Sequence, residues 1–112
     1  MSKQRAKGTR YENDLVAYFR ENGFPEAHRL EFSSPFGDIG GLPIVVEAKD
    51  QKAMTLPAWL LQGEKSGIKV GKPFAIFHKR ARKPVAKHYV TWELDQIVPL
   101  LVELVDLRSK TA

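Results

Sequence analysis

The chain has 112 residues, of which 43% are hydrophobic and 28% are charged, a composition that suits one globular domain and excludes wholesale disorder. It contains no cysteine, which excludes a disulfide framework and a thiolate zinc site, and no apolar run approaches the ~18–20 residues that cross a membrane. Lys and Arg number 18 against 13 Asp and Glu, and this net charge of +5 fits either a nucleic-acid partner or a merely basic protein. The basic N-terminus lacks the apolar segment of a secretory signal, so we expect a cytoplasmic location, which for a virus or mobile element is the host cytoplasm.

The hydrophobic pattern predicts helices and strands that form a single domain over residues 1–112. Its first seven residues, 1–7, are expected to form a flexible basic arm. In chain order the predicted elements are a helix over residues 8–22, strands over 27–32, 38–39 and 44–49, a helix over 56–66, strands over 74–78 and 88–92, and a helix over 93–107. This order, α-β-β-β-α-β-β-α, predicts an α/β fold in which helices flank a mixed sheet of about five strands.

Glu12 is the first candidate for chemistry. At ~100° per residue it projects into the apolar sector of the first predicted helix. A carboxylate directed towards a core costs several kcal/mol unless it is paired or metal-bound. Glu12 is therefore a candidate ligand; the alternatives are that it lies at the rim of the sector and reaches water, or that it pairs with Arg10 or Lys7.

The strand over residues 44–49 carries a second polar feature. Its alternation places Glu47 and Lys49 on one face, where the alternative to a functional role is an ion pair at the end of the strand. If the chain reverses around Leu42-Pro43, Asp38 pairs with Glu47 and the three side chains converge, whereas a reversal at Gly40-Gly41 would change this register. Alone, Asp38 could equally be a turn residue. Two carboxylates so close favour a hard divalent cation such as Mg²⁺ or Mn²⁺.

These features together resemble the PD-(D/E)XK nuclease superfamily: an acid on the first helix, Gly37-Asp38-Ile39 opening a hairpin, and Glu47-Ala48-Lys49 on the next strand. The sequence departs from the superfamily pattern where Gly37 replaces the proline before the aspartate. Within the superfamily, the chain is most similar to the small archaeal-type Holliday junction resolvases, over most of residues 8–80. The motifs that carry this similarity are Gly8-x-x-x-Glu12, Gly23-Phe24, Ser33-Ser34, Glu47-x-Lys49 and Gln62. The resemblance implies a restriction-endonuclease-like fold.

The resemblance also implies roles for these residues. Glu12, Asp38 and Glu47 would hold Mg²⁺ or Mn²⁺, directly or through water, and Lys49 would orient the attacking water and stabilise charge on the phosphoryl oxygens. These roles agree with the needs of phosphodiester hydrolysis, in which a water must lose a proton beside an anionic phosphate.

Three further residues are accessory candidates. Ser33 or Ser34 matches the loop hydroxyl of the family, and Gln62 is either a family residue or an ordinary exposed helix residue. The three histidines, His28, His78 and His88, do not show zinc-ligand spacing and are interpreted as structural, with His78 or His88 as alternative phosphate donors near the second basic cluster.

Two basic clusters are candidates for contacts with DNA phosphates. The first comprises Lys3, Arg5, Lys7 and Arg10, and the second comprises Lys79, Arg80, Arg82, Lys83 and Lys87. Lys52 is a further candidate. Phosphate contacts position a duplex without reading its sequence, and no base-reading module is recognisable, so recognition of DNA shape is expected. The alternative for the second cluster is a solvated connection that protects a sheet edge.

The last predicted helix is apolar over far more than the ~100° stripe of a simple surface helix. We therefore expect part of it to form the interface of a two-fold homodimer, with a well-buried helix as the alternative.

The function that the resemblance implies is a Mg²⁺-dependent endonuclease acting on branched DNA, namely a Holliday junction resolvase of DNA recombination and repair. The first alternative is a nuclease of the compact VRR-NUC type, which is similar around Val46-Glu47-Ala48-Lys49 and would act on nicks, flaps or forks. The second alternative is a basic DNA-binding protein without catalysis, in which the acids form ion pairs.

Overall fold

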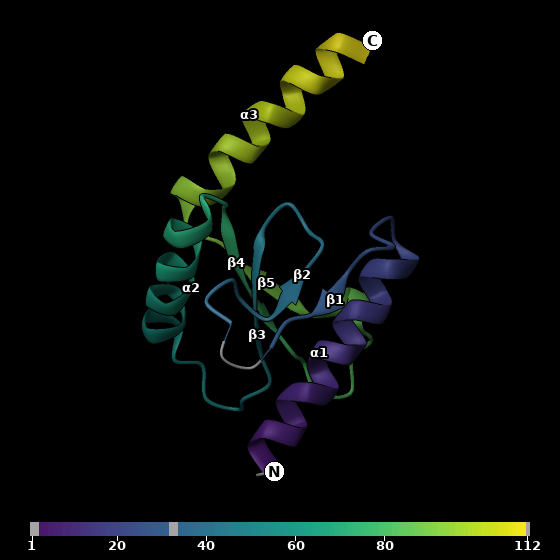
Figure 1. The fold of residues 1–112 in the computed structure, drawn as a ribbon, viewed down its shortest axis with the longest axis vertical. Coiled ribbons are helices and arrows are strands. Elements are labelled where there is room, and N and C mark those ends of the chain that lie inside the picture. The colour runs from purple at the N-terminus through teal and green to yellow at the C-terminus, as the bar shows by residue number, and fades with distance from the viewer. Residues whose placement is uncertain (1–2, 32–33, 112) are drawn as a thin grey trace.

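Five strands form one mixed sheet in the order β1-β2-β3-β4-β5 (Figure 1). The computed structural model describes residues 3–31 and 34–111. The elements are α1 (Lys3–Glu21), β1 (His28–Arg29), β2 (Ile39–Gly40), β3 (Val45–Lys49), α2 (Leu56–Val70), β4 (Phe74–His78), the 3₁₀-helix η1 (Val85–Lys87), β5 (Tyr89–Thr91) and α3 (Leu94–Thr111). The predicted α/β class and element order are confirmed.

The strand directions follow from the connections. β1, β2 and β3 are successively antiparallel, β3 and β4 are parallel across the crossover helix α2, and β5 returns antiparallel to β4. Ile39 pairs with Val46, so the reversal between β2 and β3 is centred on Leu42-Pro43 and the alternative register is excluded. This pairing puts Asp38 opposite Glu47.

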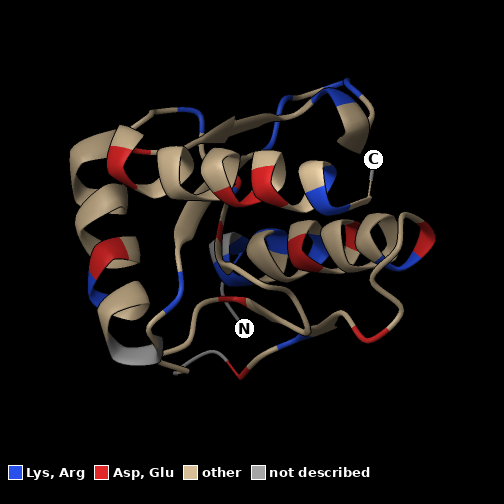
Figure 2. Cartoon of the chain, turned by 90° about the horizontal axis from the view of Figure 1, so that it is seen from above, with Lys and Arg blue, Asp and Glu red and all other residues tan. Residues whose placement is uncertain are grey.

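The two faces of the sheet are covered by different helices (Figures 1 and 2). On one face, the buried α1 side chains Tyr11 and Leu15 pack against Ile39 and Val46. On the other face, α2 lies so close to β4 that a Cβ atom on Gly63 would be 2.4 Å from the Phe74 ring. Alternation along β3 therefore sends Val46 towards α1 and Glu47 towards α2.

Several predicted boundaries were wrong, for local reasons. The segment over residues 3–7 is helical rather than a loose arm, and the ion pair between Lys7 and Asp50 (3.4 Å) attaches it to the end of β3. α2 continues past Gly67 to Val70 and ends with Gly71 in the left-handed conformation (φ 66°). Gly67 does not end the helix; it leaves space for Lys72 O, which would lie 2.9 Å from an added Cβ atom. β1 is shorter than expected, and α3 is longer.

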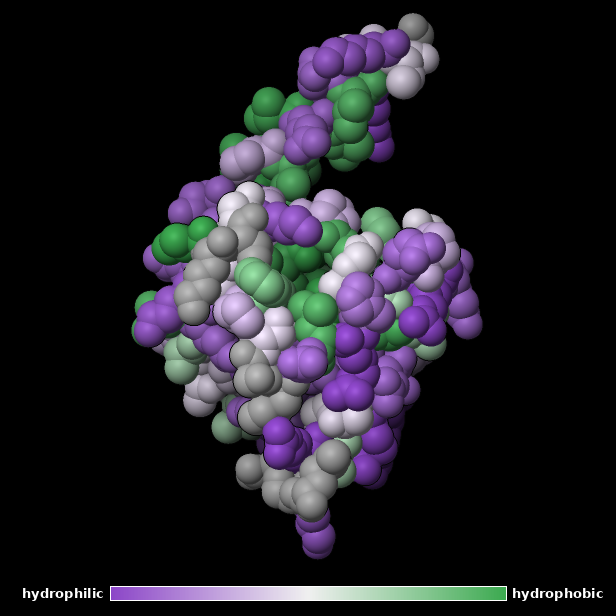
Figure 3. Space-filling model, in the orientation of Figure 1, coloured by the Kyte–Doolittle hydropathy of each residue, from purple (hydrophilic) through white to green (hydrophobic). Residues whose placement is uncertain are grey.

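α3 leaves the rest of the domain and projects beyond it (Figure 1). None of its described residues is buried, so the alternative of a well-buried helix is wrong. Figure 3 shows hydrophobic surface along this projecting helix. None of the helices within residues 3–31 and 34–111 combines the length and the apolar character that crossing a membrane requires.

Candidate active site

β2 and β3 separate at Asp38. The Asp38 N–H donates to Val46 O (2.8 Å), and one carboxylate oxygen of Asp38, Oδ2, accepts a hydrogen bond from the Ala48 N–H (2.7 Å). The side chain thus satisfies a backbone donor of β3 that the diverging strand no longer reaches. Lys49 follows beyond this fork, and a cavity of about 690 Å³ opens there.

The backbone conformation at position 37 requires glycine. Its φ of 91° is outside the range of proline, whose ring holds φ near −65°. An added Cβ atom would also lie 2.8 Å from Val46 O and Val45 Cγ1. The chain therefore reaches Asp38 along a path that requires glycine.

Glu47 is a buried carboxylate, only 2% exposed, on the α2 side of the sheet. Its pKa is raised to about 7, chiefly by burial and then by the negative charge of Asp38, while Lys49 and a hydrogen bond from Ser66 act in the opposite direction. The Ser66 Oγ donates to Glu47 Oε1 at 3.3 Å. Burial also raises the pKa of Asp38, against the Ala48 hydrogen bond and the charge of Lys49.

Lys49 is positioned by α2. Its Nζ donates to Gln62 Oε1 (2.8 Å) and lies 5.9 Å from the centroid of the Trp59 ring. Gln62, an accessory candidate from the sequence, is thus the hydrogen-bond acceptor of Lys49. The pair lines the cavity at the fork.

Glu12 reaches the same cavity from α1. Its partner is Arg29 of β1, whose Nε donates to Oε1 at 3.1 Å, so the expected alternatives of pairing with Arg10 or Lys7 were wrong. Burial and the charge of Asp38 raise the pKa of Glu12, and Arg29 lowers it. Glu12, Asp38 and Lys49 line one cavity, whereas Glu47 is not among the residues of its lining.

The expected metal ligands are neighbours without forming a ready-made metal site. Asp38 raises the pKa of both Glu12 and Glu47 by its charge, which reflects their proximity. Within the described part of the chain, however, no group of three or more His, Asp or Glu side chains is arranged to hold a metal ion.

The basic clusters meet beside this cavity. A second cavity, of about 540 Å³, shares Lys7, Asp50, Gln51 and Lys52 with the first, and its basic lining adds Arg10, Lys79, Arg80 and Arg82. Asp50 joins the clusters because it forms ion pairs with Lys7 (3.4 Å) and Lys79 (3.7 Å). Lys3, Arg5 and Lys83 are exposed and are not among the described residues of either lining.

The two serines are placed differently. Ser34 accepts a hydrogen bond from the Phe36 N–H (3.1 Å) and so stabilises the loop before Asp38. It is not among the residues that line the cavity at the fork. Ser33 lies outside the described residues.

Sequence reasoning missed several contributors. No sequence motif singles out Ser66 or Arg29, and Asp50 was recognisable only as the acid that directly follows Lys49.

In the second cavity, His78 is 4% exposed and packs edge-on against Trp59, with ring centroids 5.2 Å apart. Burial lowers its pKa, and within the described chain neither ring nitrogen has a hydrogen-bond partner.

Comparison with known proteins provides no relative: no family model matches the chain, and neither does any curated protein or solved structure.

Proposed function

We propose that the chain is a Mg²⁺- or Mn²⁺-dependent endonuclease that hydrolyses phosphodiester bonds in branched DNA, as a Holliday junction resolvase does. The observation that supports this most is the fork of β2 and β3. There, Asp38 immediately precedes β2 and accepts a hydrogen bond from Ala48 N–H of β3, between Glu47 and Lys49 in that strand and next to a cavity with basic neighbours.

The donor chemistry fits a hard divalent cation. The candidate ligands are carboxylates only, and burial together with the charge of Asp38 raises the pKa values of Glu12 and Glu47, a penalty that a cation would reduce. Asp38 and Glu47 would hold the ion, and Glu12 would join them after separating from Arg29. When bound, the ion would relieve charge on the phosphate and lower the pKa of a water.

The chain's own residues would do the remaining work. The Lys49 ammonium, held by Gln62, would stabilise charge on the phosphoryl oxygens. Ser66 would keep Glu47 oriented through its hydrogen bond. The basic lining of the second cavity would hold the backbone of the same DNA through phosphate contacts.

The test is cleavage of a labelled four-way junction, a flap and a linear duplex, each with Mg²⁺ and with EDTA. We expect paired symmetric nicks in the junction only, and only with the metal. Comparable cleavage of flap or duplex would favour the VRR-NUC-like alternative. Binding without cleavage under several divalent metals would favour a non-catalytic DNA-binding protein.

Two variants test the residues. Asp38→Asn removes the charge while its amide oxygen can still accept the Ala48 hydrogen bond, and Glu47→Gln removes the buried charge. Both should abolish cleavage and retain DNA binding, whereas Glu64→Gln, an exposed control on α2, should cleave normally. Near-normal turnover of either site variant would show that the site is assigned wrongly.

A further inference from the structure

α3 carries an apolar stripe with coiled-coil spacing. Leu94, Val98, Leu101 and Val105 follow one another at intervals of four, three and four residues, which places them along one side of the helix. They are between 49% and 78% exposed. The stripe is therefore an ordered helix face that its own domain leaves uncovered.

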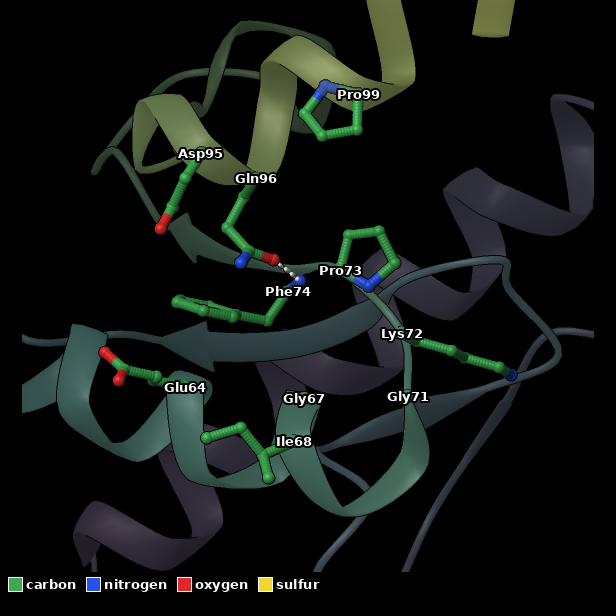
Figure 4. Close-up of a pocket in the computed structure, with 10 residues that line it drawn as sticks. All are labelled: Glu64, Gly67, Ile68, Gly71, Lys72, Pro73, Phe74, Asp95, Gln96 and Pro99. Carbon is green, nitrogen blue, oxygen red and sulfur yellow. Dashed lines mark hydrogen bonds between the residues drawn. The ribbon is translucent and has the colours of Figure 1, made fainter.

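The orientation of the stripe is set by contacts on the opposite side of α3. Gln96 Oε1 accepts a hydrogen bond from the Phe74 N–H (2.9 Å), which attaches the first turn to β4. Asp95, Gln96 and Pro99 line a cavity shared with α2 and β4 (Figure 4). Because the polar side of α3 faces its own domain, the apolar side faces away from it.

We propose that this stripe packs against α3 of a second copy of the chain, in an antiparallel pair whose two-fold axis passes beside residues 99 and 100. Around this axis Leu94 lies opposite Val105 of the partner subunit, and Val98 lies opposite Leu101 of the partner subunit. All four stripe residues are then paired, and Pro99 lies on the side of α3 that faces away from the partner helix. The proposal does not depend on the nuclease function.

The charges of α3 select the antiparallel direction. Glu93 immediately precedes the helix, Asp95 lies in its first turn and Arg108 lies in its last turn, where Lys110 is paired with Asp106 of the same helix (3.0 Å). An antiparallel pair brings the acidic start of each helix near the basic end of the other, whereas a parallel pair would place like charges together.

The exposed area is also sufficient for a stable pair. Val102 and Leu104, which flank the stripe, are 64% and 44% exposed. Together with the stripe these apolar side chains expose roughly 600 Å² per chain, so a symmetric pair could bury up to about 1,200 Å², at the lower end of the range of specific interfaces.

The first test is molar mass in solution, by light scattering during gel filtration. The wild-type chain should have twice the mass of one chain at micromolar concentration. Leu101→Lys should weaken the dimer at least tenfold, and Glu103→Lys, on the opposite side of α3, should leave it intact. Circular dichroism verifies that both variants remain folded. A monomeric wild-type chain at tens of micromolar, or equal dimerisation by Leu101→Lys, would overturn the proposal.

The second test uses the absence of cysteine to determine the direction of pairing. Under mild oxidation, chains with Val98→Cys mixed with chains with Leu101→Cys should form disulfide-linked heterodimers, and so should Leu94→Cys mixed with Val105→Cys. Leu94→Cys alone should stay unlinked, because the two positions lie far apart along an antiparallel pair. Efficient linkage of Leu94→Cys alone would refute the antiparallel pairing.

Discussion

Replacing Glu47 by glutamine should stabilise the domain while abolishing cleavage. The carboxyl is 2% exposed, and its pKa in the folded chain is about 7, compared with an ordinary value of 4.5. Because one pKa unit corresponds to about 1.4 kcal/mol, the ionised form costs the folded state about 3 kcal/mol. Glutamine keeps the shape of the side chain and carries no charge.

The pH dependence of this cost has a definite sign. Between pH 4.5 and about 7, the unfolded chain has lost the Glu47 proton and the folded chain still holds it. The free energy of unfolding of the wild type therefore falls by about 3 kcal/mol as the pH rises through this window, and the contribution is constant above it. The Glu47→Gln variant lacks this contribution, so its advantage should reach roughly 10 °C in Tm at pH 8.

Thermal unfolding followed by circular dichroism from pH 4.5 to 8.5 in EDTA measures this difference. The exposed control Glu64→Gln should follow the wild type across the range. At pH 8, Mg²⁺ should raise the Tm of the wild type and leave that of Glu47→Gln nearly unchanged, because the proposed ion binds the carboxylate. A Glu47→Gln variant less stable than the wild type at pH 8 in EDTA would refute the claim that this buried charge is costly.

Three other changes have definite expected outcomes. Lys49→Ala should slow cleavage by about 100-fold or more while Mn²⁺ binding, measured by calorimetry, persists; loss of metal binding would contradict its role at the phosphate. Gly63→Ala should lower the free energy of unfolding by ~1–3 kcal/mol, because its Cβ atom would meet Phe74, whereas Gly8→Ala, on an open part of α1, should raise it by ~0.5–1 kcal/mol. Equal effects in denaturant titrations would contradict the close packing of α2. Arg80→Ala should weaken DNA binding and reduce the salt slope by about one, and an unchanged slope would exclude a phosphate contact.

The pairing at the fork could be predicted as one of two registers. The β-branched run before Glu47 predicted a buried strand, but the sequence allowed a reversal at Leu42-Pro43 or at Gly40-Gly41, and only the pairing of Ile39 with Val46 selects the first. If the pairing of β3 with β2 were shifted by one residue, every β3 side chain would point to the opposite face of the sheet. The hydrophobic pattern of β3 therefore disfavours such a shifted register.

Other features depend on contacts that no local pattern contains. Glu12 pairs with Arg29 because β1 lies beside α1, and neither residue reveals that neighbour in the sequence. Gly67 resembles a helix terminator, but its lack of a side chain serves packing against residues after the helix. The start of α1 was missed, and the ion pair between Lys7 and Asp50 that attaches this start to the end of β3 joins segments that are far apart in the chain.

Asp50 acts as an internal counterion of the basic surface. In the free domain it already occupies Lys7 and Lys79, so an approaching phosphate must compete with a carboxylate that is permanently present. Under the proposed function, this competition would weaken adhesion to arbitrary DNA. A DNA backbone that presents several phosphates at once would overcome it more easily than a single phosphate would.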